Sequence, residues 1–303
     1  MRRSRLMAPG VGLLFLAVGC GSSPNSTTAV PVSSSPTSPA GQPSVVSAKD
    51  YDPSRFDLSY VVDNELLPML PGMHLVWEGH ALDEGDRLDR RVELTITDMT
   101  KVIDGVRTIV AWEVDSDNGQ VVETELAFFA QDVDGNVWNF GQYPEEYEGG
   151  EFVKAPAWLQ GIQGAKAGLT MKAHPALGTP TYAQGWGPRV GWNDRAQAYR
   201  MGESACTPVD CFEDVLVIRE YSRDEPNAWQ LKFYAPGVGN VRVGWMGSGE
   251  EEREVLVLVE QEQLGADALT EARRHVLDLE ERAYDISKDV YALTAPMEPQ
   301  PEA

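Results

Sequence analysis

The stretch Arg91-Val-Glu-Leu-Thr-Ile-Thr97 alternates polar and apolar side chains at every step. Because successive side chains of a β-strand point to opposite faces, its three aliphatic residues share one face and its polar residues the other. The same period of two recurs in Val106–Val114 and in Val122–Phe128. This period predicts half-buried β-strands rather than helices.

Short polar dipeptides separate these segments. Asp104-Gly105, Asn118-Gly119 and Asp134-Gly135 combine residues that tolerate positive φ, which is typical of tight hairpins. Strands joined by hairpins run antiparallel. Further strands are predicted at Met73–His80, Val137–Gly141, Arg195–Ser204, Phe212–Ser222, Trp229–Ala235, Asn240–Met246 and Arg253–Glu260. The sequence therefore predicts a mainly β fold of about ten strands, an antiparallel meander forming a curved sheet, half-barrel or barrel-like sheet.

One long segment, residues 141–191, interrupts the meander with many glycines, prolines and aromatic residues and no clear period. Segments of this kind are functional or packed on themselves. Aromatic faces line pockets for lipids and sugars, so a ligand-binding site is predicted here. The alternative is that the rings only anchor the segment on the sheet. The candidate ligand-binding residues are Trp138, Tyr143, Trp158, Tyr182, Trp186 and Trp192.

Near the C-terminus the period changes from two to 3.6. Apolar residues recur every three or four positions and predict an amphipathic helix over about 267–293, with Asp267 as its N-cap. We expect this helix to pack on the open face of the sheet. The alternative is a coiled-coil dimerisation helix, although only three heptads are available. A monomer is predicted, with a single domain over 49–294 and a disordered tail over 295–303.

The first twenty residues have the features of an export signal. Arg2, Arg3 and Arg5 precede an apolar stretch too short to span a bilayer, and Ala17-Val18-Gly19-Cys20 follows it. The last four residues resemble a lipobox. The sequence therefore predicts a signal peptide over 1–19, a lipid-acylated Cys20 and a disordered Ser/Pro/Thr-rich tether to residue 48. The alternative is a plain secretory signal with a chance cysteine.

Composition and charge restrict the possible partners. The chain has 303 residues, of which 42% are hydrophobic and 24% charged, the balance of an ordinary globular protein. Its formal charge of −22 becomes more negative once the three leader arginines are removed. Nucleic acid and anionic lipid headgroups would be repelled. The predicted partners are a bacterial membrane, reached through the anchor on Cys20, and an envelope protein, glycan or lipid ligand.

The remaining cysteines, Cys206 and Cys211, flank a Pro-containing turn. In an exported protein they are predicted to form a local disulfide. Their spacing does not fit a redox CxxC motif, and no further metal ligand is near in sequence. We therefore predict no metal site and no cofactor.

Sequence motifs for catalysis are weak. Asp132-Val-Asp-Gly-Asn136 resembles the opening of a calcium loop, but Val137 and Tyr143 stand where such a loop needs glycine and a bidentate acid, so a hairpin turn is favoured. Glu145 and Glu146 could supply the carboxylates of a glycosidase, but such pairs are expected by chance in a chain with 47 acids. No nucleophile with a positioned base is found, so no catalytic residue is predicted.

Several turn sequences resemble a known family of secreted and lipid-anchored bacterial proteins. They are Pro71-Gly72, Val102-Ile-Asp-Gly-Val106, Ala130-Gln-Asp-Val-Asp-Gly-Asn-Val-Trp-Asn-Phe-Gly141, Thr207-Pro-Val-Asp-Cys-Phe-Glu-Asp-Val-Leu216 and Phe233-Tyr-Ala-Pro-Gly-Val-Gly-Asn-Val241. The resemblance covers roughly 56–246 and departs from the family at Pro208-Val-Asp-Cys-Phe212, where a Pro-Ala-Gly-Thr-Phe turn is usual. It implies a β-rich envelope protein without an assigned activity, and it brings no catalytic residues.

Two classes of function remain. The first is a membrane-anchored, non-enzymatic binding or structural protein of the cell envelope. The second is a carrier of a lipid or other amphiphile in a concave β-sheet, and it requires the C-terminal helix to leave an apolar cavity open. A glycan-active hydrolase is the weakest alternative.

Overall fold

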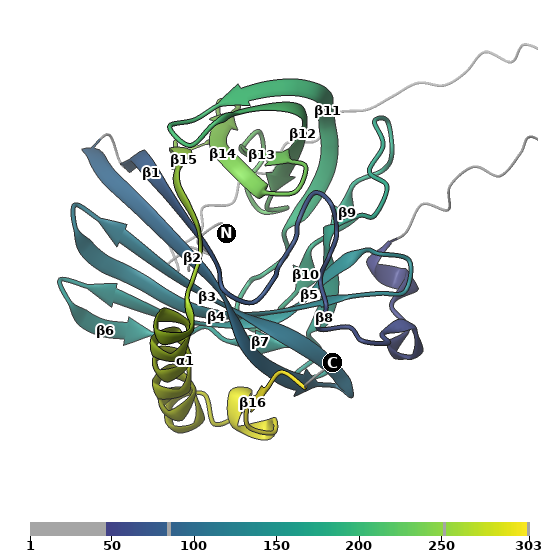
Figure 1. The fold of residues 1–303 in the computed structure, drawn as a ribbon, viewed down its shortest axis with the longest axis vertical. Helices are drawn as coiled ribbons and strands as arrows, with labels where there is room; N and C mark the ends of the chain where they lie inside the picture. The colour runs from purple at the N-terminus through teal and green to yellow at the C-terminus, as the bar shows by residue number, and fades with distance from the viewer. Residues whose placement is uncertain (1–46, 84–85, 251–252, 302–303) are drawn as a thin grey trace, which may run out of the picture.

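The computed structural model describes residues 47–83, 86–250 and 253–301. The predicted export signal, Cys20 and almost all of the tether lie outside the described residues. Within the described part, one 16-stranded sheet curves round a central space, and a single α-helix lies against its outer face (Figure 1). The predicted mainly β, antiparallel, barrel-like fold with a C-terminal helix is confirmed.

The strands predicted from the period of two are present, and several are longer than expected. Hydrogen bonding to neighbours on both sides extends them beyond the alternating core of each segment. Their bounds are β1 Met73–Asp83, β2 Asp86–Ile103, β3 Val106–Asp117, β4 Gln120–Gln131, β5 Val137–Glu148, β11 Arg195–Cys206, β12 Cys211–Tyr221, β13 Trp229–Ala235, β14 Gly239–Met246 and β15 Val255–Gln263. Along the sheet they follow the order β5-β4-β3-β2-β1-β15-β14-β13-β12-β11, and neighbouring strands in this order are antiparallel.

The hairpin turns are formed by the predicted dipeptides. Asp104 and Gly105 between β2 and β3 both have positive φ, as do Asn118 and Gly119 between β3 and β4. This backbone matches the twist of the flanking strands, which is why such dipeptides favour two-residue hairpins.

The segment 141–191 contains more regular structure than its sequence suggested. It completes β5 and adds β6 Glu151–Lys154, β7 Trp158–Leu159, β8 Lys166–Met171, β9 Tyr182–Ala183 and β10 Gly185–Trp186. Most of these strands are too short to show a period of two, which is why the pattern missed them. The segment is therefore part of the sheet wall and not a separate excursion.

Residues 182–186 join the two ends of the sheet. Tyr182 and Ala183 pair with β11, while Gly185 and Trp186 pair with β8. The two strands approach closely here: a Cβ on Gly168 of β8 would lie 2.2 Å from the Gly185 nitrogen. Closure removes exposed sheet edges and makes one face of the long strands the inner wall of a barrel.

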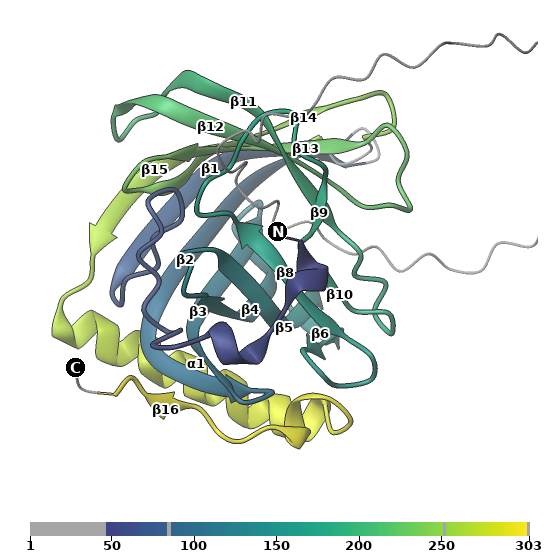
Figure 2. The ribbon, with the colours of Figure 1, turned by 90° about the vertical axis from the view of Figure 1, so that its right-hand side faces the viewer.

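The helix α1, Ala266–Ile286, is shorter than predicted, and a 3-10 turn, η3 Tyr291–Leu293, follows it. The N-cap is Gly265, and Asp267 lies in the first turn. The predicted apolar stripe is buried from Ala272 to Ala283, whereas Ile286 is 42% exposed. Figure 2 shows α1 on the outer side of the curved sheet, where it contacts β2.

A buried ion pair fastens α1 to the sheet. The Nζ of Lys101, a residue with no exposed surface, lies 2.8 Å from Glu280 Oε1 and also donates to the Ala295 carbonyl. Glu280 accepts further bonds from the Tyr291 hydroxyl and the Met297 amide. Strand β2, the helix and the C-terminal segment therefore meet at one pair of opposite charges.

The predicted disordered tail is wrong for its described part. Met297 is buried, and β16, Glu298–Pro299, pairs with Met99 and Thr100 of β2. The low-complexity composition of the tail gave no sign of these contacts, because they depend on the carboxylate of Glu280 and on the free edge of β2.

An N-terminal strap crosses one end of the barrel. It follows the 3-10 turns η1 Ala48–Asp50 and η2 Pro53–Arg55. Ser59 accepts a backbone hydrogen bond from Gln131 at the end of β4, and Glu65 accepts one from Gly237 between β13 and β14. Leu67 and Met69 of the strap then reach the interior. The strap thus connects opposite walls and contributes apolar side chains to the central space.

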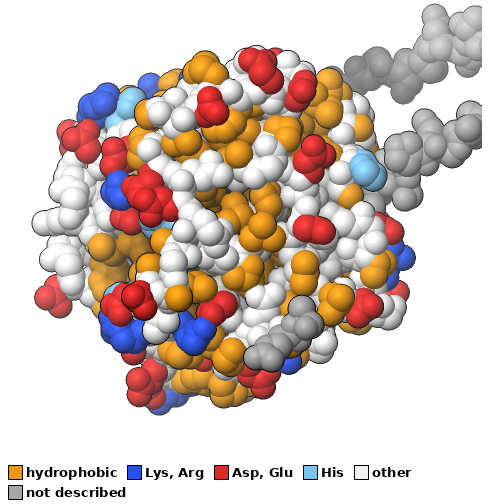
Figure 3. Space-filling model, viewed as in Figure 1, with side chains coloured by type: hydrophobic (Ala, Val, Ile, Leu, Met, Phe, Trp, Pro, Cys, Tyr) orange, Lys and Arg blue, Asp and Glu red, His pale blue; other side chains and the backbone are white. Residues whose placement is uncertain are grey.

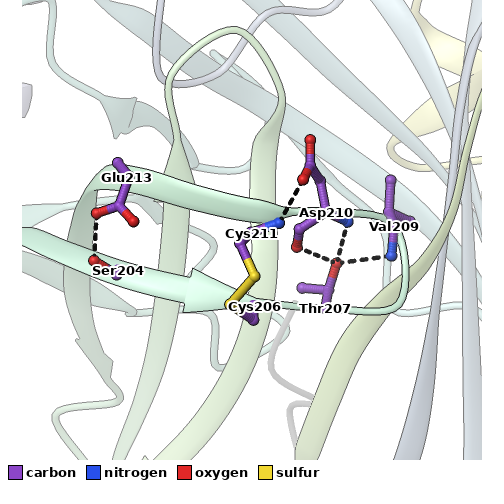
Figure 4. The surroundings of a disulfide bond; sticks show 7 residues. All are labelled: Ser204, Cys206, Thr207, Val209, Asp210, Cys211 and Glu213. Carbon is purple, nitrogen blue, oxygen red and sulfur yellow. Dashed lines mark hydrogen bonds between the residues drawn. A yellow bond between two sulfur atoms is a disulfide. The ribbon is translucent and has the colours of Figure 1, made fainter.

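Cys206 and Cys211 form the predicted disulfide across the β11–β12 hairpin (Figure 4). Both residues are exposed, and Thr207 bonds to the backbone of Asp210 within the turn. The bridge encloses a very short loop at the protein surface.

We expect the double substitution Cys206→Ser and Cys211→Ser to lower the free energy of unfolding by at most about 2 kcal/mol, because a short loop loses little chain entropy when it is cross-linked. Urea denaturation of the two proteins measures this difference. Thiol titration of the unreduced, denatured wild-type protein should find neither thiol free; two free thiols would disprove the bridge.

Candidate functional site

The side chains on the inner wall of the barrel change from apolar to acidic along the barrel axis. Ile96, Ala111 and Ala127 lie side by side on β2, β3 and β4. Two positions further along each strand, the cross-strand neighbours are Leu94 on β2, Glu113 on β3 and Glu125 on β4. The next row toward the β3–β4 turn is Val92, Asp115 and Glu123. Because residues two apart share a face, β3 and β4 change from apolar to acidic within the barrel.

The opposite wall changes in the same direction. On β12 the inward residues are Leu216, Ile218 and Glu220. Where the chain enters β15, the acidic Glu254 precedes the apolar Leu256 by two positions, and both line the cavity. Glu254 lies 3.0 Å from Arg90, the last inward residue of the β2 series. The charged positions of both walls are therefore at one end of the barrel, and the strap lies toward the other.

A cavity lies between these walls. Its volume is about 120 Å³. Engineered apolar cavities of similar size admit benzene. Its apolar lining includes Leu67, Met69, Trp77, Val92, Leu94, Phe129, Trp192 and Leu256, and its charged lining is Glu113, Asp115, Asp194, Glu220, Lys232 and Glu254. Figure 3 shows hydrophobic and acidic side chains together on the face of the molecule seen in Figure 1.

Two basic residues balance part of the acidic end. Arg90 bonds to Asp117 and to Glu254, and Lys232 Nζ lies 3.0 Å from Glu220. Burial alone would raise the pKa of Glu220, but the ammonium of Lys232 outweighs it, and the pKa is lowered. Glu220 is therefore the ionised member of a buried pair with Lys232.

Asp115 and Glu125 differ from these paired acids. Both are at least nine-tenths buried, and Asp115 Oδ1 and both carboxylate oxygens of Glu125 have no hydrogen-bond partner in the described part of the chain. Burial, followed by the charges of Glu113 and Glu123, raises the pKa of both carboxyls well above its usual range. Facing carboxylates and unpaired buried oxygens destabilise a fold, so this arrangement points to a functional role.

The six aromatic residues predicted to bind a ligand are not brought together in one pocket. Trp192 lines the cavity and stacks on Trp158 with ring centres 5.9 Å apart. Tyr182 is buried in the closing segment, and Trp186 is 41% exposed. The other two belong to separate clusters. Trp138 donates to Asp132, and Tyr143 donates to Glu145 beneath α1. A ligand-binding role fits the position of Trp192 best.

The carboxylates considered for a calcium loop or a glycosidase form hydrogen bonds and ion pairs within the protein. Asp132 accepts bonds from the Asp134 and Asn136 amides, the Asn136 side chain and Trp138, which is the network of a hairpin turn. Glu145 binds Arg282 on the outer face, while its neighbour Glu146 pairs with Lys154. Adjacent residues of a strand point to opposite faces, so Glu145 and Glu146 do not converge on one substrate.

Metal and membrane features were sought in the described ranges. No group of three or more His, Cys, Asp or Glu side chains there could hold a metal ion. None of the helices in these ranges has the length and apolar character needed to cross a bilayer.

No protein-family profile and no curated protein matches the chain. Two crystal structures show limited similarity, each over 65% of this chain and 98% of its own. One is a Bacteroides fragilis protein described as exported and of YmcC-like fold, with 13% identity and a TM-score of 0.39. The other is a Parabacteroides distasonis protein described as a lipoprotein, with 14% identity and a TM-score of 0.37.

The sequence analysis missed the acidic end of the barrel. One signal was present: Glu113, Asp115 and Asp117 alternate on one strand, as do Glu123 and Glu125 on the next, with a two-residue turn between them. An antiparallel hairpin must bring these side chains onto one face. Such a face is ordinarily solvated, and only barrel closure turns it inward.

Proposed function

We propose that this protein is an extracytoplasmic, membrane-anchored binding protein that holds a small amphiphile inside its barrel. The cavity with an apolar and a charged end carries this proposal. A carrier of this kind requires the C-terminal helix to leave the cavity open, and α1 lies outside the barrel. Apolar walls stabilise a buried chain, and a polar end fixes its orientation.

Binding of simple eight-carbon probes tests this function. Octanol, octanoate and octylammonium would be titrated into the chain that starts at Ser47, which keeps every described element, and followed by calorimetry and tryptophan fluorescence. Trp77 and Trp192 line the cavity and would report occupancy. We expect at least one probe to bind with one-to-one stoichiometry. Absence of binding by all three would disprove the proposal.

A matched pair of tryptophan substitutions locates the site. Trp192 lies in the cavity wall, whereas Trp186, from the same segment, is 41% exposed. We expect Trp192→Ala to weaken binding of the best probe by about 10-fold or more, the equivalent of about 1.4 kcal/mol. Trp186→Ala should leave binding within a factor of two. Equal effects of the two substitutions would place the site outside the barrel.

The anchor is proposed from the leader sequence. Cys20 follows a lipobox-like tripeptide, and the tether after it has a reach of roughly 30 Å as a coil, which would hold the barrel near the membrane. Such proximity suits exchange of an amphiphile with a bilayer.

In a bacterial host fed radiolabelled palmitate, we expect the wild-type chain to be labelled and Cys20→Ala to lose the label completely. Cys206→Ser serves as the matched control, because it removes a cysteine elsewhere and should keep the label. Label retained on Cys20→Ala would show that the leader is a plain secretory signal.

A further inference from the structure

We infer that the amphiphile bound in the barrel carries a positively charged head with N–H donors, a primary ammonium or a guanidinium. This inference rests on the proposed function and specifies its ligand class. It depends on the polar groups at the charged end, on their burial and on the hydrogen bonds that they lack.

The unpaired oxygens at this end are hydrogen-bond acceptors, while the unpaired Trp192 Nε1 donor on the cavity lining lies against Gly185 of the closing segment. Besides Asp115 Oδ1 and the two Glu125 oxygens, the amide oxygens of Gln142 and Gln230 are buried without a partner in the described part of the chain. Gln142 lies on β5 two positions from Pro144, which faces Glu125, and Gln230 bonds through its nitrogen to Glu254. Of the residues with these unpaired oxygens, Asp115 also lines the cavity. A bound group that supplies donors there would satisfy its unpaired oxygen.

The charge balance also favours a cation. Arg90 is shared between Asp117 and Glu254, and Lys232 is paired with Glu220, so these bases already have carboxylate partners. Glu113 faces Glu125 across β3 and β4, and Asp115 faces Glu123. A cation in the cavity beside Asp115 would lie against a buried carboxyl without a counter-charge, and it would favour the ionised form of that acid.

The neighbouring walls favour an organic cation over a metal ion. The described carboxylates do not converge into a group that could hold a metal. Leu94 and Val92 lie beside Glu113 and Asp115 on the next strand, and Trp77 lies beside Val92. An ammonium or guanidinium head could contact the acids while its apolar chain extends along the barrel toward Phe129, Met69 and Leu67.

The eight-carbon probes separate this inference from the proposed function. At pH 7 and low salt, we expect octylammonium to bind at least 10-fold more tightly than octanol, and octanoate to bind more weakly than either. Octyltrimethylammonium carries the charge but no N–H donor and should bind more weakly than octylammonium. If octanol or octanoate binds as tightly as octylammonium, the cationic class is wrong while the barrel remains a binding site.

Substitution of the two buried acids provides the second arm. Asp115→Asn with Glu125→Gln should remove the preference for octylammonium over octanol while octanol binding stays within a factor of three. The matched control is Glu271→Gln with Asp278→Asn, which removes two carboxylates that pair with Arg274 on the exposed side of α1. This control should keep the preference. Preference retained after the barrel substitutions, or lost equally in the control, would overturn the inference.

Discussion

Replacing Lys101 with Met is expected to destabilise the protein by about 3–5 kcal/mol, because it leaves the carboxylate of Glu280 buried without a counter-charge. Lys101 is fully buried, and its ammonium also lies 4.1 Å from the centre of the Tyr291 ring. Glu280 is 5% exposed and cannot turn to water without moving α1. Urea denaturation followed by tryptophan fluorescence measures the loss.

Two further variants distinguish the cost of breaking the Lys101–Glu280 ion pair from the cost of losing a basic side chain. Arg274→Met removes an exposed base that pairs with Glu271 and Asp278 on the same helix, and it should change stability by less than about 0.5 kcal/mol. Glu280→Gln keeps an acceptor for Tyr291 and Met297 but removes the charge. Combined with Lys101→Met, it should cost less than the sum of the two single substitutions. Additive losses would contradict a coupled buried pair.

The second large effect is expected from the buried acids of the barrel and has the opposite sign. Asp115→Asn with Glu125→Gln should raise the stability of the ligand-free protein at pH 7, by about 1 kcal/mol or more for each carboxyl, because an amide stays neutral where burial and the neighbouring acids disfavour ionisation. A residue that weakens the fold and is retained at a cavity wall is typical of a binding site. The variant and the wild type would be compared by urea denaturation without ligand.

The pH dependence gives a second measure of the same groups. Burial raises the pKa of Asp115 and Glu125 in the folded chain above the unfolded values. Between those values the folded chain holds protons that the unfolded chain has released, so these two acids make stability fall as the pH rises. Their contribution is complete below the unfolded pKa and is lost as the pH passes the folded pKa.

Other groups that face the two acids must be considered in this titration. They are Glu113 on β3, Glu123 on β4 and Glu254 before β15, with Arg90 nearby on Asp117 and Glu254. The double substitution leaves these groups in place and should flatten the fall above the unfolded pKa. An unchanged pH profile would show that Asp115 and Glu125 are not responsible for it.

The sequence predicted the strand-forming segments well because the period of two is a local property. Arg91–Thr97 lies within β2, and Trp229–Ala235 has the predicted bounds of β13. Both residues of Asp104-Gly105 and of Asn118-Gly119 have the expected positive φ, whereas in Asp134-Gly135 only the glycine does. The apolar stripe of the helix was also predicted correctly, since its residues between 272 and 283 are buried. Short strands such as β9 and β10 were not predicted, because two residues cannot display a period.

By itself, the sequence determined that the chain forms an antiparallel β-meander with a C-terminal helix and which side chains share a face of each strand. It also predicts an export signal, which lies outside the described residues. Only the tertiary structure decided which face of each strand points inward. That choice depends on long-range pairing of residues 182–186 with both β8 and β11 and on α1 covering the outer wall. Local periodicity places Glu113 and Asp115 on one face, but only closure of the barrel makes that face a buried acidic wall.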